Sequence, residues 1–245
     1  MENARKKIKI PSEIVFIIAN VLLALAVSVV STADFGLSMI VAPAYILHLK
    51  IGITFGQAEY VVGAILFIIF CIVVKRVKLI YFFAFLTCLF YGAVLDLFRL
   101  IPAFNPTITP PGSMDLWLRI IYFIVGELLT AFSVALSFKC YIFPQVTDFF
   151  VKGITETYAL NQGKFKWGYD ASMFLVALIM TLAFFGRFEG IKFGTIILTL
   201  VNGPILALMS KLIDRFIDIN TAFPKLEKLF VIEKRKSKTN CETEN

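Results

Sequence analysis

The sequence predicts an all-α polytopic membrane protein with about six transmembrane helices, arranged as two inverted three-helix repeats. The 245 residues are 59% hydrophobic and 17% charged, with a mean hydropathy of +0.84, whereas soluble domains are about 45–50% apolar and about 25% charged. Apolar runs close to the ~20 residues that span a bilayer recur along nearly the whole chain. In each half, a mixed polar and apolar segment follows the first run, where we expect a re-entrant or interfacial element.

Six apolar runs define the expected spans. They cover residues 11–32, 57–74, 77–98, 116–138, 169–186 and 191–212. Each is expected to be helical, because lipid offers no hydrogen-bond partner to an open backbone and the runs lack the alternation of a membrane β-strand. The expected divisions are a basic N-terminal segment (1–10), a first repeat (11–101), an extracytoplasmic linker (102–115), a second repeat (116–215) and a charged cytoplasmic tail (216–245).

The first run has an alternative interpretation. A basic start, an apolar stretch and the small residues Ser31, Thr32 and Ala33 are compatible with a signal peptide that is cleaved before Asp34. We prefer an uncleaved helix, because the stretch is long for a signal peptide and more membrane sequence follows it.

The Lys and Arg residues are distributed unevenly between the two ends of the expected helices. Because basic residues concentrate in cytoplasmic loops, the pattern predicts a multi-pass protein with both termini in the cytoplasm. The net charge of +7 then has a topological explanation, so we expect the lipid bilayer, and no nucleic acid, as a partner. Only five of the 24 basic residues fall on the outer side: Lys50, Arg99, Arg119, Arg187 and Lys192.

Two segments that interrupt the apolar pattern occupy equivalent places in the two halves. Residues 34–55 and 139–168 each contain a proline, and each is too long for a tight turn and too short for a domain. Glu59 and Asp170, in the runs that follow, each precede an arginine by seventeen residues. A three-span unit that is repeated once enters the membrane from opposite sides, which predicts inverted repeats. The alternative is that any two apolar segments look alike.

Several short motifs occur in order along nearly the whole chain. They are Ala33-Asp34-Phe35-Gly36-Leu37-Ser38, Gly163-Lys164-Phe165-Lys166 leading to Asp170, Gly186-Arg187-Phe188-Glu189-Gly190-Ile191, Gly194-Thr195 and Gly203-Pro204. Together these motifs resemble the YczE/YyaS/YitT-like family of bacterial integral membrane proteins. The resemblance implies the architecture and a bacterial cell (inner) membrane rather than a reaction, because that family is largely uncharacterised. The chain departs from the family's pattern after Pro144, where Gln145-Val146-Thr147-Asp148 stands in place of small residues.

Glu127 is the first candidate for a binding role. It lies near the middle of the fourth expected span, where an ionised carboxylate costs a few kcal/mol or more unless it is protonated, paired or hydrated. Gly126 and Thr130 flank it and allow a neighbouring helix to approach closely. Glu127 is therefore either a proton or cation site or a protonated side chain that bonds to a facing helix.

A helix break is expected in the last span. Asn202 directly precedes Gly203 and Pro204, and the proline removes a helical hydrogen bond and frees carbonyl groups. Asn202 and, in the first span, Asn20 are candidate polar contacts for a substrate. The alternative is that the break serves packing alone.

Charged residues near the ends of the expected spans are assigned mainly structural roles. Asp34 is expected to cap a half-helix that starts beside Gly36, or else to bind a ligand. Asp170 lies four residues after Lys166, so the two are expected to form an ion pair. Glu59, Asp96 and Arg99 are expected to reach water at the membrane surface, with gating as the alternative.

Standard catalytic signatures are absent from the sequence. His48 is the only histidine, and no Walker-type loop, dinucleotide fingerprint or Gly-x-Ser-x-Gly elbow occurs. We therefore expect no enzyme activity, no metal and no cofactor. The leading hypothesis is a secondary transporter or permease for a small solute or ion. The alternatives are a membrane scaffold or regulatory protein that acts through its cytoplasmic loops and tail, and a channel. A homo-oligomer is compatible with each.

Overall fold

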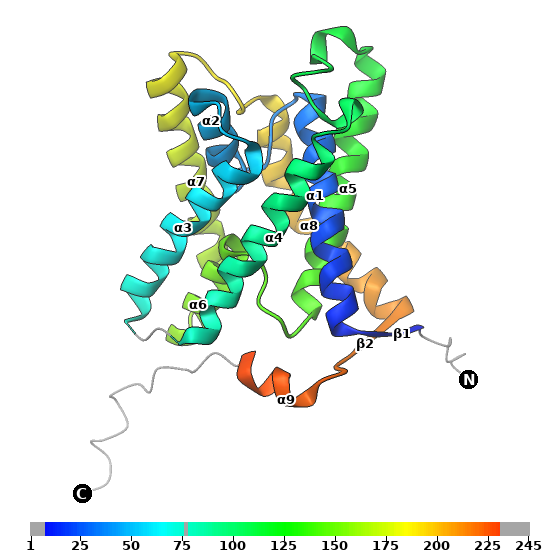
Figure 1. Cartoon of the computed structure of the whole chain (residues 1–245), viewed down its shortest axis with the longest axis vertical. Coiled ribbons are helices and arrows are strands. Elements are labelled where there is room, and N and C mark those ends of the chain that lie inside the picture. Colours follow the sequence, from blue (N-terminus) through cyan, green and yellow to red (C-terminus); the bar gives the residue numbers. More distant parts are fainter. Residues whose placement is uncertain (1–7, 76–77, 231–245) are drawn as a thin grey trace, which may run out of the picture.

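The protein is described by a computed structural model over residues 8–75 and 78–230, and most of these residues are helical (Figure 1). Residues 1–7 of the predicted basic segment, 76–77 at the predicted start of the third span and 231–245 of the predicted tail lie outside the described residues. The elements are β1 (Ile8–Pro11), α1 (Ser12–Ala33), α2 (Ala42–Ile51), α3 (Phe55–Val74), η1 (Leu79–Tyr81), α4 (Phe82–Phe98), η2 (Pro102–Phe104), η3 (Pro111–Ser113), α5 (Leu116–Lys139), α6 (Val146–Tyr158), α7 (Gln162–Phe185), α8 (Phe193–Phe216), β2 (Ile217–Asn220), α9 (Pro224–Glu227) and η4 (Lys228–Phe230).

Five helical stretches are long and apolar enough to cross a membrane, and a bent α8 supplies a sixth. The five are α1, α3, η1 with α4, α5 and α7. Many of their large apolar side chains, such as Ile17, Ile68 and Ile179, are exposed. A soluble monomer rarely exposes so much apolar surface, whereas lipid would cover it. The predicted spans are confirmed to this extent: the described chain holds five to six helices suited to a bilayer.

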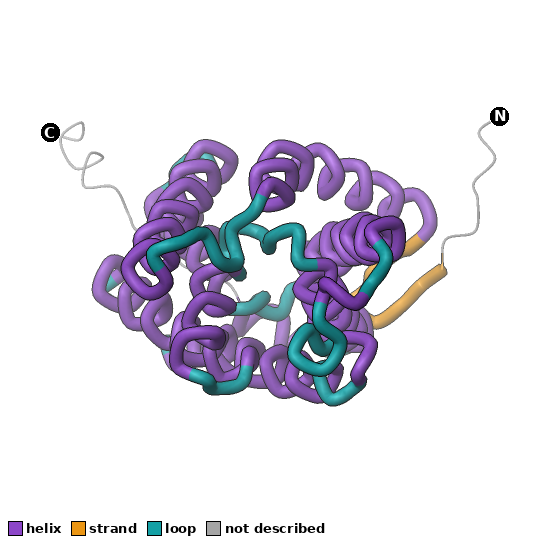
Figure 2. Tube along the Cα trace, turned by 90° about the horizontal axis from the view of Figure 1, so that it is seen from above, coloured by secondary structure: helices purple, strands orange, loops and turns teal. Residues whose placement is uncertain are grey.

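Each interrupting segment contains a short helix that packs among the long ones. α2 lies toward one end of the molecule and α6 toward the other (Figure 1). α2 packs against α3 and α7, and α6 packs against the same two helices and against α4. Most residues of α6 are buried, so protein rather than solvent shields its backbone. Viewed from above, loops connect across the middle of the surrounding helices (Figure 2).

Two other long helices account for most of the packing of α1. α1 packs along α5 and also contacts α4, and it is the most buried of the five straight spans. Small residues line the α1–α5 contact, and at Gly126 a β-carbon would press against Val30 and approach the carbonyl oxygen of Ala26. Small residues let helix backbones approach closely in membranes. The expectation of a close helix approach at Gly126 is therefore confirmed.

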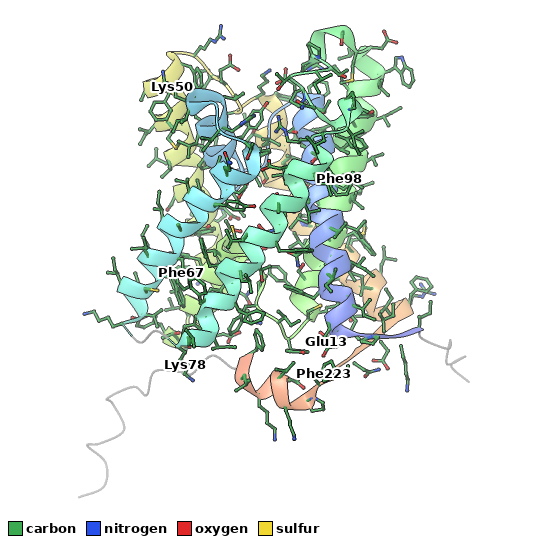
Figure 3. All side chains as sticks on the ribbon, in the orientation of Figure 1. Glu13, Lys50, Phe67, Lys78, Phe98 and Phe223 are labelled. Carbon is green, nitrogen blue, oxygen red and sulfur yellow. The ribbon has the colours of Figure 1, made fainter. Side chains whose placement is uncertain are left out.

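Residues 8–11 and 217–220 pair in a small sheet that was not predicted from the sequence. β1 pairs with β2 in parallel, with Ile8 opposite Ile217, so the fold departs from purely α. Glu13, at the start of α1, accepts hydrogen bonds from the hydroxyl of Tyr141 at 2.7 Å and from the backbone amide of Phe223 at 3.2 Å (Figure 3). Residues 217–230 are thus attached to the bundle.

Candidate binding site

Two buried polar side chains, one on α3 and one on α7, lie within electrostatic range of each other. Glu59 on α3 is 4% exposed and Tyr169 on α7 is 7% exposed. The carboxyl oxygen Oε1 of Glu59 and the hydroxyl of Tyr169 have no hydrogen-bond partner among the described residues. The ring of Phe150 on α6 stacks on that of Tyr169 at 5.3 Å between centroids. Buried polar atoms are nearly always hydrogen-bonded, so these two unpartnered groups are candidates for contact with a ligand.

Two further carboxylates and one lysine border this group. Asp170 accepts a hydrogen bond from Lys166 at 3.4 Å, which confirms the predicted ion pair one turn apart. Asp148 on α6 is half-buried, and burial raises the pKa of its carboxyl. Lys166 lowers the pKa of Asp148, whereas Asp170 raises it. Glu59, Asp148 and Asp170 all lie within electrostatic range of Tyr169. The group is therefore acidic, with one lysine to balance three carboxyls.

Glu127 on α5 is the second buried carboxyl inside a long helix. It is 6% exposed, and its Oε1 atom has no hydrogen-bond partner in the described part of the chain. Gly126 beside it faces α1, and Thr130 one turn later donates its hydroxyl proton to the carbonyl of Gly126 at 2.9 Å. Thr130 therefore does not satisfy the carboxyl, and Glu127 stays available to a proton or a cation.

The two candidate asparagines are placed differently. Asn20 is buried in α1, and its amide donates to the carbonyl of Phe16 one turn earlier at 2.8 Å, which is a local structural contact. Asn202 is half-buried in α8. Among the described residues, no hydrogen bond joins Glu127 with either asparagine, so a shared polar site of these three residues gains no support.

The predicted break in the last helix is present. α8 bends by 48° where Phe193–Thr199 meets Val201–Phe216. The bend falls one turn before Pro204, because a proline ring clashes with the carbonyl four residues earlier. Gly203 and Pro204 are exposed, and nothing lies within 4 Å of a β-carbon placed on Gly203. The break therefore opens toward the outside of the described protein rather than toward Glu59 or Glu127.

Asp34 connects both halves of the chain at the end opposite β1. Lys192, just before α8, donates to its Oδ2 at 2.7 Å, and Arg119 of α5 lies 3.7 Å from the same oxygen. Arg119 also donates to the carbonyl of Ala33 at 3.0 Å. Asp34 ends α1 in the left-handed conformation, and no side-chain bond caps α2 at Val41. The expectation that Asp34 caps a following half-helix is therefore wrong, because partners distant in sequence engage its carboxylate.

Replacing Asp34 by asparagine should lower the free energy of unfolding by about 1–2 kcal/mol, because two half-buried ion pairs are lost. Asparagine tolerates the left-handed backbone, so the change isolates the charge. Thermal unfolding in detergent measures the effect, which should shrink at high salt. Glu189→Gln is the matched control, since its partner Arg187 is exposed, and it should cost less than about 0.5 kcal/mol. An equal loss in both variants would contradict the prediction.

The burial of Glu59 was not predicted from the sequence. The second span was expected to start at residue 57, so Glu59 appeared to be a helix-end charge that reaches water. α3 in fact begins at Phe55, behind a Thr54–Gln57 capping box, and α2, α4 and α6 pack against this helix. The expectation of a water-exposed Glu59 is wrong, and Tyr169 and Asp148 were not named as candidates for a shared site. The capping box is the sequence signal that would have moved the helix start.

The fold and these sites define a polytopic α-helical membrane protein with buried carboxyl groups inside its spans. The chain matches a family model over residues 10–211 and belongs to DUF6198, a family of unknown function. Searches of curated proteins and of solved structures gave no significant match. The matched region contains α1 to α7 and α8 as far as residue 211, so the buried carboxyls lie within it.

Proposed function

We propose that this protein is a secondary transporter or permease that moves a small solute or ion through a site between two inverted three-helix repeats. One observation carries the proposal. Two carboxyl groups, Glu59 and Glu127, are buried within long apolar helices, and each keeps an oxygen atom without a partner among the described residues. Ionisable groups at such positions are costly, and in membrane proteins they mark proton relays and ion pathways.

The packing of the helices supports the repeat. If α1–α4 correspond to α5–α8, then the contact of α1 with α4 corresponds to that of α5 with α8. The contact of α2 with α7 likewise corresponds to that of α6 with α3. The two short helices lie toward opposite ends (Figure 1), as inverted copies require. The extensive contact of α3 with α4 has no comparable counterpart between α7 and α8, so the two halves differ there.

The acidic group at α3, α6 and α7 supports a site between the repeats. Glu59 and Asp170 occupy equivalent positions in the proposed repeats, and both lie near Tyr169. Asp148 adds a carboxyl from the short helix of the second repeat. A site built from interrupted segments and spanning helices is typical of inverted-repeat transporters. The excess of carboxyls favours a cation, a proton or both as the species bound there.

We further propose that the protein lies in a bacterial cell membrane with both ends in the cytoplasm. The first and last described residues lie at one end of the molecule. Nearly all basic residues outside the five named above flank that end or the loops expected on its side. The bacterial assignment rests on the resemblance of the motifs to the YczE/YyaS/YitT-like family.

Replacing Glu127 by glutamine should abolish proton-coupled uptake in proteoliposomes, because glutamine keeps the shape of the side chain but cannot carry a proton. Internal pH is followed with trapped pyranine while sodium, potassium, small amines and small carboxylates are applied in turn. The matched control is Glu227→Gln, an exposed glutamate in α9, which should transport like the wild type. If Glu127→Gln kept full pH-coupled uptake, Glu127 would not be the residue that carries the coupled proton. A folded wild type that moves no member of the panel would argue against transport.

A further inference from the structure

Arg99 is a buried cation at the end of α4, remote in sequence from the acidic group. It is 7% exposed, although the sequence pattern suggested a side chain that reaches water. Its Nη1 atom has no hydrogen-bond partner among the described residues. Its Nη2 atom lies 3.4 Å from Nε2 of His48 in α2, and its guanidinium carbon lies 5.2 Å from the ring centre of Phe55 in α3. Three elements therefore enclose the guanidinium.

No carboxylate of the described residues lies within ion-pair distance of Arg99. The nearest candidate along the chain, Asp96, is engaged elsewhere. One of its oxygens accepts the backbone amide of Gly56 at 2.8 Å, and the other accepts the hydroxyl of Thr54 at 2.5 Å. Asp96 therefore holds the start of α3 and supplies only a distant charge to Arg99.

His48 faces Arg99 as an acceptor. Its Nδ1 atom lies 2.5 Å from the carbonyl oxygen of Ile53, and a carbonyl can only accept, so Nδ1 carries a proton. In neutral His48 the Nε2 lone pair then accepts a hydrogen bond from Nη2 of Arg99. Burial and Arg99 lower the pKa of His48, while its bond to Ile53 and the charge of Asp96 raise it. The imidazole thus satisfies one edge of the guanidinium and leaves the Nη1 edge free.

A buried guanidinium with a free edge is unfavourable unless an anion or further acceptors reach it, because desolvation of a charge costs several kcal/mol. Burial accordingly lowers the pKa of Arg99, with Tyr45 and Asp96 opposing the shift. Tyr45 is buried in α2 and packs edge-on against Phe55. The guanidinium of Arg99 therefore lies beside the ring of Phe55, with the phenol of Tyr45 within electrostatic range.

We propose that Arg99 and His48 form a binding site for a free small oxyanion, a carboxylate or inorganic phosphate, at the end of the molecule opposite β1. The anion contacts Nη1 of Arg99, whose planar fork suits the oxygens of such groups. Binding would place negative charge beside His48 and favour its protonation, so that Nε2 becomes a second donor. Of the titratable groups that face His48, Asp96 also favours this protonation, whereas Arg99 opposes it. The site stands whether or not the protein is a transporter.

Anion binding is measured as the rise in melting temperature of the full-length protein in dodecyl maltoside. Sodium acetate and sodium phosphate are each titrated against sodium chloride at the same ionic strength, which corrects for salt screening. The wild type should show a saturable rise of about 3 °C or more with at least one of them. Arg99→Gln should lower the apparent affinity at least about tenfold. Arg187→Gln, which removes an exposed arginine (76%) at the same end, should respond like the wild type.

A second variant, His48→Gln, tests the site independently in case Arg99→Gln does not fold. His48→Gln keeps Arg99 but cannot take up a proton at position 48. In the wild type, acetate should bind more tightly as the pH falls from about 8 to about 6, and this dependence should vanish in His48→Gln. Acetate serves here because it stays ionised over that range.

Three results would overturn the proposal. The first is a wild type that neither acetate nor phosphate stabilises beyond the chloride baseline. The second is an Arg99→Gln variant with the wild-type response. The third concerns a further titration with dihexanoyl phosphatidylglycerol, a lipid phosphodiester. Stabilisation by this lipid alone, and by neither free anion, would assign the site to a lipid headgroup.

Discussion

Gly56→Ala should destabilise the protein by about 3 kcal/mol, although alanine normally favours a helix over glycine. Gly56 on α3 crosses Gly92 on α4, and a β-carbon at position 56 would collide with the backbone carbonyl oxygen of Gly92. The next atom in its path, an oxygen of Asp96, would lie at 2.6 Å. A backbone atom cannot rotate away as a side chain can, so α3 and α4 would have to separate. Thermal unfolding in detergent, followed by circular dichroism, measures the loss.

Gly168→Ala is the matched control for this prediction. Gly168 lies inside α7, and nothing lies within 4 Å of a β-carbon placed on it. Its replacement should leave stability unchanged or raise it by up to about 1 kcal/mol, through helix propensity alone. Equal melting temperatures for Gly56→Ala and Gly168→Ala would show that the crossing at Gly56 is looser than described.

Glu59→Gln should eliminate the dependence of uptake on the proton gradient while the fold persists. Coupling between two ligands typically changes affinity by about 5- to 150-fold, and in this variant the factor should fall to about one, which means no coupling. Glutamine has the shape of a protonated glutamate and no proton to release. Because Glu59 lacks a hydrogen-bond partner at Oε1, the change breaks no described contact of that atom. Melting temperature should therefore stay close to that of the wild type.

The measurement is uptake with and without an inward proton gradient in proteoliposomes. Asp170→Asn is the comparison, since its carboxylate already pairs with Lys166 and should contribute less to coupling than Glu59. Tyr169→Phe, which removes the unpartnered hydroxyl, should weaken solute binding but retain coupling. If Glu59→Gln retained coupling and Asp170→Asn lost it, the proton-binding group would be Asp170 on α7 and not Glu59 on α3.

Local sequence patterns predicted the helices well. The six predicted runs match the long helices, and the two interrupting segments hold the short helices α2 and α6. The Lys166–Asp170 pair and the break before Pro204 were also predictable, because each depends on residues within one helical turn. The β1–β2 pair was not, since its strands lie more than two hundred residues apart.

The candidate site was only partly predictable. Glu127 was identified because a carboxylate in the middle of an apolar run is conspicuous in any context. Glu59 and Arg99 lie near the ends of apolar runs, where a charged side chain usually reaches water. Arg99 is enclosed by His48 of α2 and Phe55 of α3, and Glu59 lies beside Cys88 of α4. No local sequence pattern reports such contacts between helices.

The sequence by itself determined that this protein enters a bilayer, how many helices it offers and where they are interrupted, because these properties depend on the transfer of each segment from water to lipid. Only the tertiary structure decided which polar groups face protein. Asp34 meets Lys192 across 158 positions of sequence, and Glu59 lies near Tyr169 on a helix of the other half. Hydropathy measures the environment of a helix as a whole, whereas the packing of neighbouring helices selects the face on which each charge is enclosed.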